Sequence, residues 1–178
     1  LQDKRDFTLD TLRDAAYDSY LTWFDMPLPS LIRAWEQTPA DSPMRAATAD
    51  QVAALKAWDR RWSIDSVPTS LAIFWAEDIV RLIAADARKA DISMEEYVAA
   101  RATPEQLLKS LAAASDKLTA DFGKWQTPWG EINRFQRLTN DIVHPFSDAA
   151  PSIPVGFTSG NYGSLASFGA RRYMGSKR

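Results

Sequence analysis

The sequence predicts a mainly α protein, and three observations support this fold class. All seven glycines lie at Gly123 or later, so glycine does not interrupt the long segment before it. Apolar residues recur in that segment at intervals of three and four. Three sites carry the Ser or Thr followed by Glu or Gln that marks helix N-termini. We therefore expect a multi-helix, bundle-like segment over about residues 8–123, followed by a Gly/Pro-rich loop and short-strand tail.

The first expected helix begins after Thr8, where apolar residues recur at helical spacing: Leu9, Leu12, Ala16, Tyr20 and Trp23 or Phe24. Proline lacks a backbone N–H and clashes with the preceding turn, so Pro27 and Pro29 are expected to end this helix. A short helix is expected next, over residues 31–35.

Two more helices are expected in the middle of the chain. A loop over residues 39–43 precedes Thr48, whose hydroxyl is expected to form a capping box with Gln51 and to start a helix through Trp58. Residues 66–68, Ser-Val-Pro, open the longest helix, and its apolar stripe predicts that it is the central core helix. The stripe consists of Leu71, Phe74, Trp75, Ile79, Leu82 and Ile83.

The last two expected helices carry clear N-terminal caps. Residues 93–96 read Ser-Met-Glu-Glu, and residues 103–106 read Thr-Pro-Glu-Gln. In the second of these, proline occupies the first helical position, where its missing N–H costs little. The last long helix is expected to stop at Gly123.

The chain changes character after this last helix. Residues 139–178 contain several prolines and five glycines, with little helical pattern. The block over residues 152–157 cannot satisfy its own backbone hydrogen bonds as a helix, so we expect a short strand that needs a neighbouring sheet. We therefore divide the chain into a helical region over residues 1–138 and a loop and short-strand segment over residues 139–178.

Composition and charge exclude several functional classes. The 21 basic and 23 acidic residues leave a formal charge of -2, which gives no long-range attraction to nucleic acid or to anionic lipid. The absence of cysteine excludes disulfides, thiolate catalysis and a cysteine-ligated zinc. No apolar run approaches the length of a membrane span. The N-terminus has neither an initiator methionine nor a signal peptide, so we expect a processed or truncated product.

The candidate catalytic residues each have an ordinary structural explanation. His144 is the only histidine, and no nucleophile elbow accompanies it, so a loop histidine before Pro145 is the favoured interpretation. The carboxylate pairs at residues 77–78 and 95–96 suggest acid–base chemistry only superficially, because adjacent helical side chains point about 100° apart. The second pair also suits a helix N-terminus, which favours negative charge.

Two features near the C-terminus and the tryptophans call for the same choice. Tyr173 and Lys177 have the Y-x-x-x-K spacing of short-chain dehydrogenases, but no dinucleotide fingerprint precedes them. The glycines at 169 and 175 miss the phosphate-loop pattern, and the basic residues at 171–178 are most simply a solvated end. The seven tryptophans are expected mostly in the core rather than around a ligand, with Trp125 and Trp129 the least certain of them.

Three segments share their order and spacing with a known family. They are residues 57–66 (AWDRRWSIDS), residues 129–138 (WGEINRFQRL), and the tail over residues 151–157 and 163–171. Together they resemble the penicillin acylase family of N-terminal nucleophile hydrolases, and the tail is most similar to its acyl-homoserine-lactone acylase branch. The motif positions, to which we assign structural roles, are Trp58, Asp59, Arg61, Ser63, Asp65, Ser66, Trp129, Gly130, Asn133, Arg134 and Phe135.

The resemblance implies a parent protein whose chemistry this chain does not carry. Members of the family have an αββα fold and cut themselves into an α-chain and a β-chain, whose N-terminal serine is the nucleophile. An asparagine in an Asn-Asp-Pro-His-like segment helps to hold the oxyanion. Here residue 1 is Leu1, and Asn140-Asp141 comes nearest to that segment but is followed by Ile142. We therefore expect no catalytic residue, and a chain that is a C-terminal part of the β-chain.

The same resemblance sets the remaining expectations. The parent would hydrolyse the amide bond of a small N-acyl substrate and would be periplasmic or secreted. The partners of this chain would be the α-chain and the rest of the β-chain, with no nucleic acid and no membrane. No cofactor is expected, and the ligands of the structural calcium that the family often carries are not matched here. The alternative is a self-standing helical interaction module, which the clean helix caps also suit but the glycine-rich tail disfavours.

Overall fold

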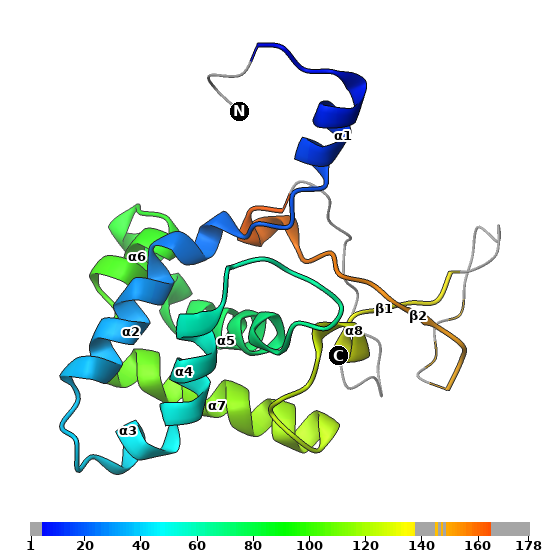
Figure 1. The fold of residues 1–178 in the computed structure, drawn as a ribbon. Helices are drawn as coiled ribbons and strands as arrows, with labels where there is room; N and C mark the ends of the chain where they lie inside the picture. The colour runs from blue at the N-terminus through cyan, green and yellow to red at the C-terminus, as the bar shows by residue number, and fades with distance from the viewer. Residues whose placement is uncertain (1–4, 138–144, 146, 148, 165–178) are drawn as a thin grey trace.

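The computed structural model describes residues 5–137, 145, 147 and 149–164 (Figure 1). The described residues form eight α-helices, two 3-10 helices and one two-stranded sheet. The helices from α2 to α7 gather into one body, whereas α1 and the β1–β2 ribbon extend from it in different directions (Figure 1). The mainly α fold class is confirmed.

The first helix is shorter than the apolar spacing predicts. α1 spans Leu9–Ala16 and begins at the capping box of Thr8. After α1 the chain is not helical again until Thr22. Trp23 lies in the separate 3-10 helix η1, Thr22–Asp25, where it is buried. Pro27 and Pro29 begin α2, Pro27–Gln37, instead of ending a helix. The physical reason is that the first turn of a helix needs no donor from its N–H groups, so proline is well placed there.

The segment between α2 and the longest helix also differs from the expectation. The loop after Pro39 gives way to a short helix, α3 (Pro43–Ala47), and α4 spans Ala49–Ala57. The predicted capping box of Thr48 is wrong. Its hydroxyl donates to the carbonyl of Met44 at 2.8 Å, while the Gln51 amide donates to Ser115 Oγ at 2.8 Å in the interior. Both side chains therefore have partners that the local sequence pattern does not reveal.

The centre of the molecule is the longest helix, as expected. α5 spans Val67–Ala90, and its N-cap Ser66 accepts a hydrogen bond from the N–H of Thr69. Most of its apolar stripe is buried, but Leu82 is 53% exposed and does not belong to the core. The stripe is therefore narrower than predicted, because the neighbours of α5 cover only part of its circumference.

The remaining helices pack around α5. α6 spans Met94–Ala100 and α7 spans Pro104–Phe122, and both begin at the predicted Ser or Thr caps. α7 ends at Gly123, whose φ of 85° is accessible to glycine at little cost. α5 packs against α7 and α6, and α2 also packs against α6 and α7. The fully buried Trp75 joins α5 to α7 by donating its indole N–H to the Leu107 carbonyl at 3.2 Å.

The chain after α7 returns along the helical body. α8 (Trp129–Ile132) leads into β1 (Arg134–Phe135), which pairs antiparallel with β2 (Ile153–Pro154). The strand expected over residues 152–157 thus finds a partner within this chain, where the sequence suggested an external sheet. The 3-10 helix η2 (Gly160–Tyr162) follows and packs on η1.

An aromatic cluster fixes η2 against the helical body. The ring of Tyr162 lies 5.7 Å from that of Phe24 and 5.9 Å from that of Trp23. Gly163 approaches Thr22 so closely that a Cβ there would lie 2.0 Å from its hydroxyl oxygen. The described part of the tail therefore packs on the helices. The proposed division at residues 138 and 139 stays a prediction, and most of residues 139–148 lies outside the described residues.

Candidate functional site

The two motif segments that carry the family resemblance lie directly against each other. The N–H of Gly130 donates to the carbonyl of Ile64 at 2.7 Å, and the N–H of Trp129 donates to the carbonyl of Ser66 at 3.1 Å. These backbone bonds join α8 to the loop that precedes α5. Residues more than 60 positions apart are thus brought together at the start of the longest helix.

A third segment completes this assembly. The N–H of Val155 donates to the carbonyl of Asn133 at 3.0 Å, so the chain that follows β2 lies beside the second motif segment. The indole of Trp129 and the side-chain amide of Asn133 also donate hydrogen bonds to this returning chain. We call this assembly the motif junction, and it consists of residues 58–66, 129–135 and 153–157.

The first motif segment is folded on itself by its own side chains. The indole N–H of Trp58 donates to the carbonyl of Arg61 at 3.0 Å, and Asp59 Oδ1 accepts from the N–H of Arg61 at 2.9 Å. The hydroxyl of Thr69 also donates to the Arg61 carbonyl, at 3.2 Å. Arg60 has a φ of 62°, a left-handed conformation that is unfavourable for a residue with a Cβ. The surrounding bonds hold the segment in this tight turn.

Three motif positions near α5 have lesser roles. Ser66 caps the helix, and its own N–H donates to the carbonyl of Ser63 at 3.2 Å. Ser63 and Asp65 are exposed. Their assignment as structural positions stays a prediction.

The second motif segment binds the returning chain through side chains. The amide of Asn133 donates to the carbonyl of Val155 at 3.0 Å and to that of Phe157 at 2.6 Å. The indole N–H of Trp129 donates to the carbonyl of Gly156 at 3.0 Å. These donors satisfy carbonyls of a segment that, among the described residues, has no regular strand partner beyond β2.

Arg134 extends this pattern to the start of β2. Its Nε donates to Ser152 Oγ at 2.9 Å, its Nη2 to the Ser152 carbonyl at 2.7 Å, and its Nη1 to the Gly130 carbonyl at 3.2 Å. Phe135, its neighbour in β1, is half-buried. The fork of the guanidinium thus ties α8 to the residue that precedes β2.

Two glycines allow the close packing at the centre of the junction. A Cβ on Gly130 would lie 2.9 Å from the carbonyl oxygen and the Cβ of Ile64 and equally close to Pro154 Cβ. A Cβ on Gly156 would lie 2.5 Å from the Trp62 ring, which packs edge to face against Phe157. A side chain at either position would push the segments apart.

An ionic cluster borders the junction, and we call it the arginine clamp: Asp18, Tyr20, Asp25, Arg60 and Arg61. Arg61 Nη1 lies 2.5 Å from Asp18 Oδ1, and Arg60 pairs with Asp25. The hydroxyl of Tyr20 donates to Asp25 Oδ1 at 2.5 Å. The clamp has no signature in the sequence, since its partners are 35 and 43 positions apart and no short motif joins them.

The clamp perturbs two of its titratable groups. The hydrogen bond from Arg61 is the main cause that holds the pKa of Asp18 below its usual value, and the N–H of Tyr20 acts in the same direction. The pKa of Tyr20 is raised, chiefly by the hydrogen bond of its hydroxyl to Asp25. At neutral pH Asp18 is therefore ionised and the Tyr20 hydroxyl keeps its proton. The clamp is thus a network of ion pairs rather than an acid–base pair.

Within the part of the chain that the structure describes, the candidate chemical groups of the sequence are not brought together. Asp78 pairs with Arg81 on its own helix, and the N–H of Glu96 donates to Ser93 Oγ at the start of α6. Trp129 is buried and Trp125 is half-buried, as core residues are. His144, Tyr173, Lys177, the glycines at 169 and 175, and the basic end lie outside the described residues.

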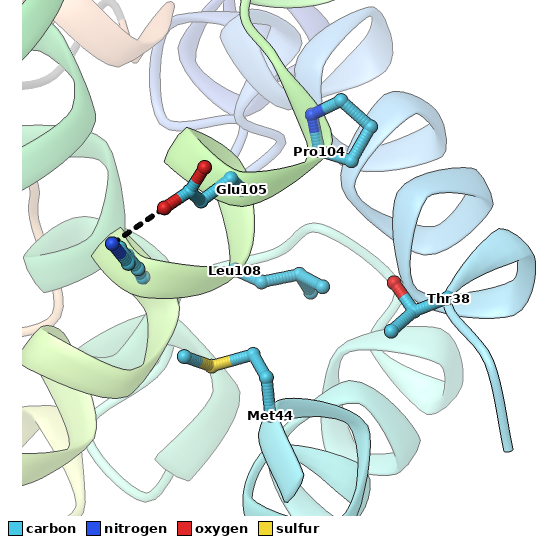
Figure 2. A pocket seen from close by; sticks show the side chains of 6 residues that line it. Thr38, Met44, Pro104, Glu105 and Leu108 are labelled. Carbon is cyan, nitrogen blue, oxygen red and sulfur yellow. Dashed lines mark ion pairs between the residues drawn. The ribbon is translucent and has the colours of Figure 1, made fainter. Parts of the chain in front are cut away.

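A pocket lies on the other side of the helical body, between α2, α3 and α7 (Figure 2). Its volume is about 330 Å³, and Thr38, Met44, Pro104 and Leu108 provide most of its wall. The rim carries the ion pair of Lys109 Nζ with Glu105 Oε1, 2.5 Å apart, which lowers the pKa of Glu105. Among its lining residues, no hydroxyl nucleophile is paired with a base, so the pocket has no catalytic arrangement.

Two searches concern other kinds of site. Within residues 5–137 and the described part of the tail, no group of three or more His, Cys, Asp or Glu side chains is arranged to hold a metal ion. In the same residues, no helix has both the length and the apolar character needed to cross a membrane.

Comparison with known proteins gives the family. No curated protein matches the chain in a search of its sequence. The family model described as penicillin amidase matches residues 1–172, a range that includes every segment of the motif junction. Since this match covers nearly the whole chain, the protein belongs to the penicillin amidase family.

Proposed function

We propose that this chain is the helical scaffold of an amide-bond hydrolase and supplies no catalytic group itself. The observation that carries the proposal is the motif junction, in which the family-motif residues bind one another and the returning chain instead of converging on a cavity. Trp129, Asn133 and Arg134 all donate to backbone carbonyls, and Arg134 also donates to Ser152 Oγ. Side chains used in this way position the backbone and are not available to a substrate.

The finer placement follows from the sequence resemblance. The chain would be a C-terminal part of the β-chain, closest to the acyl-homoserine-lactone acylases, and the nucleophilic serine would lie upstream of Leu1. Its partners would be the α-chain and the rest of the β-chain of the same precursor, in a periplasmic or secreted protein. The substrate of the whole protein would be a small N-acyl compound, with no role for nucleic acid or a membrane.

The test compares the full-length precursor with the 178-residue chain on penicillin and N-acyl-homoserine-lactone substrates. We expect hydrolysis by the full-length protein after self-cleavage, which mass spectrometry detects as a new chain with an N-terminal serine. The isolated chain should show no turnover, because in this proposal the nucleophile belongs to another part of the precursor. Turnover by the isolated chain, or a full-length protein without self-cleavage and hydrolysis, would contradict the proposal.

The alternative is a self-standing helical interaction module. One observation favours it: the described part of the tail packs on the helices through Tyr162, Phe24 and Trp23 instead of projecting as an unpaired strand. The comparison of the full-length precursor with the 178-residue chain decides between the scaffold and the interaction module. A gene that encodes no serine nucleophile upstream of Leu1 would favour the module.

A further inference from the structure

We propose that the arginine clamp is a positioning device for the active site of the full-length hydrolase. In this proposal Arg60 and Arg61 fix the path of the chain where it enters the helical scaffold. The inference rests on the proposed function, because it assumes that the catalytic serine lies upstream of this entry. It gives a specific role to Arg61, which is one of the motif positions, and to Asp18, Tyr20, Asp25 and Arg60, which are not among them.

Backbone bonds define the entry point. The N–H of Leu21 donates to the carbonyl of Arg60 at 2.8 Å, and the N–H of Trp62 donates to the carbonyl of Ser19 at 3.0 Å. Tyr20 and Arg61 form an antiparallel bridge between these two bonds. The entering chain is thus paired with the first motif segment of the junction, which itself is bonded to α8 and α5.

The side chains of Arg60 and Arg61 lie near the ring of Tyr20 at this bridge. The guanidinium carbons of Arg60 and Arg61 lie 5.9 and 5.6 Å from the centre of the Tyr20 ring. Each arginine also pairs with an aspartate of the entering chain, Arg61 with Asp18 before the bridge and Arg60 with Asp25 after it. The ion pairs therefore hold the chain on either side of Tyr20, which fixes its direction as well as its position.

The chain before the clamp is weakly held by the helical body. α1 has no buried residue, and Leu9 and Leu12 are 87% and 54% exposed. Beyond the clamp, the ring of Tyr17 lies 5.9 Å from that of Phe157. Because α1 buries no residue, we expect the direction of α1 to depend on the clamp. Figure 1 shows α1 standing clear of the other helices.

The kinetic test uses the full-length protein and four variants. Arg61→Ala and Asp18→Asn remove the ion pair, Arg61→Lys retains its charge, and Arg81→Ala is the matched control, since Arg81 pairs with Asp78 within α5. We expect Arg61→Ala and Asp18→Asn to lower kcat about tenfold, because small displacements of reacting groups have effects of this order. KM should change less than about twofold, because the clamp does not touch the substrate.

The controls separate positioning from a loss of folding. The thermal unfolding midpoints of Arg61→Ala and Arg81→Ala should be alike, since exposed ion pairs contribute little to stability. Arg61→Lys should recover most of kcat, while Arg81→Ala should match the unmodified protein. A kcat for Arg61→Ala equal to that of Arg81→Ala would overturn the proposal.

A second measurement tests the clamp without relying on activity. The 178-residue chain contains no cysteine. In this chain, spin labels can therefore be placed uniquely at Leu12→Cys on α1 and Leu82→Cys on α5, both at exposed positions. Pulsed electron paramagnetic resonance should give one narrow distance distribution, which broadens when Arg61→Ala is added. An unchanged distance distribution would overturn the proposal that the clamp fixes the direction of the chain. A full-length protein without amidase activity would contradict the proposed function alone, and the distance measurement would still decide the clamp.

Discussion

The α5–α7 core and the motif junction hold the molecule by different means. In the core, two long helices bury apolar side chains such as Ile79 and Leu111, each fully buried. In the junction, donors such as the Asn133 amide bind backbone carbonyls, and glycines such as Gly130 admit close approach. Burial of apolar area is non-directional, whereas hydrogen bonds and close contacts require fixed geometry. The core should therefore tolerate changes of shape that the junction does not.

The largest expected effect tests the core. Trp75→Ala should lower the free energy of unfolding by about 3–5 kcal/mol, because it removes a fully buried ring and leaves a cavity between α5 and α7. Chemical unfolding followed by circular dichroism measures this loss. Leu82→Ala on the same helix is the control, and it should change stability by less than about 0.5 kcal/mol, because Leu82 is exposed. Equal effects of the two variants would contradict this account of the core.

The second effect concerns the closest approach in the junction. Gly130→Ala should cost about 1–3 kcal/mol, because its Cβ would overlap the carbonyl oxygen of Ile64, which cannot move without disturbing the loop before α5. It should also make residues 151–164 more sensitive to protease. Gly123→Ala is the comparison. It meets no atom within 4 Å but has a φ of 85°, so it should cost about 1–2 kcal/mol without exposing the tail. Identical digestion patterns for the two variants would argue against the close packing at Gly130.

The third effect tests whether the side-chain amide of Asn133 is a hydrogen-bond donor in the junction. Asn133→Ala removes two hydrogen bonds to the carbonyls of Val155 and Phe157 and should cost about 1–3 kcal/mol. Asn133→Asp has the same shape but cannot donate when ionised, so it should be at least as destabilising as alanine at neutral pH. If Asn133→Asp unfolds at the same denaturant concentration as the unmodified chain, the amide is not the donor that joins these segments.

The smallest effect is the pH dependence of the clamp. The pKa of Asp18 is lowered in the folded chain, chiefly by Arg61, so its contribution is present above the ordinary carboxyl pKa of about 4 and is lost as the pH falls through the folded value. The groups that face Asp18 are the guanidinium of Arg61 and the N–H of Tyr20. The difference in unfolding free energy between the unmodified chain and Asp18→Asn should therefore be constant near neutral pH and shrink in acid. A difference that grows in acid would contradict the ion pair.

The same contrast explains how much of the structure the sequence predicts. The long helices follow from local signals, since Ser66, Ser93 and Thr103 cap them and Gly123 ends α7. Local signals mislead where a side chain has a distant partner. Gln51 does not complete a capping box because it binds Ser115, 64 positions away and buried.

The candidate site is less accessible to sequence reasoning. The resemblance to a family points to residues that lie in the junction, such as Trp129 and Asn133, but it does not say that they bind the returning chain. The clamp is invisible in the sequence, because Asp18 and Arg61 are ordinary charged residues until the fold brings them together. Contacts of this kind depend on the packing of α5 and the loop before it, which no short pattern encodes.

The most direct test of the junction is amide hydrogen exchange on the 178-residue chain, with and without Asn133→Ala. In the unmodified chain the amides of Gly130 and Val155 should be protected, because they donate to the carbonyls of Ile64 and Asn133. The substitution should lower protection of both amides together and leave that of α5 and α7 unchanged, as expected for a locally cooperative unit on an intact core. Unchanged exchange at Gly130 and Val155, or equal loss throughout α5 and α7, would contradict a junction that holds the tail on the bundle.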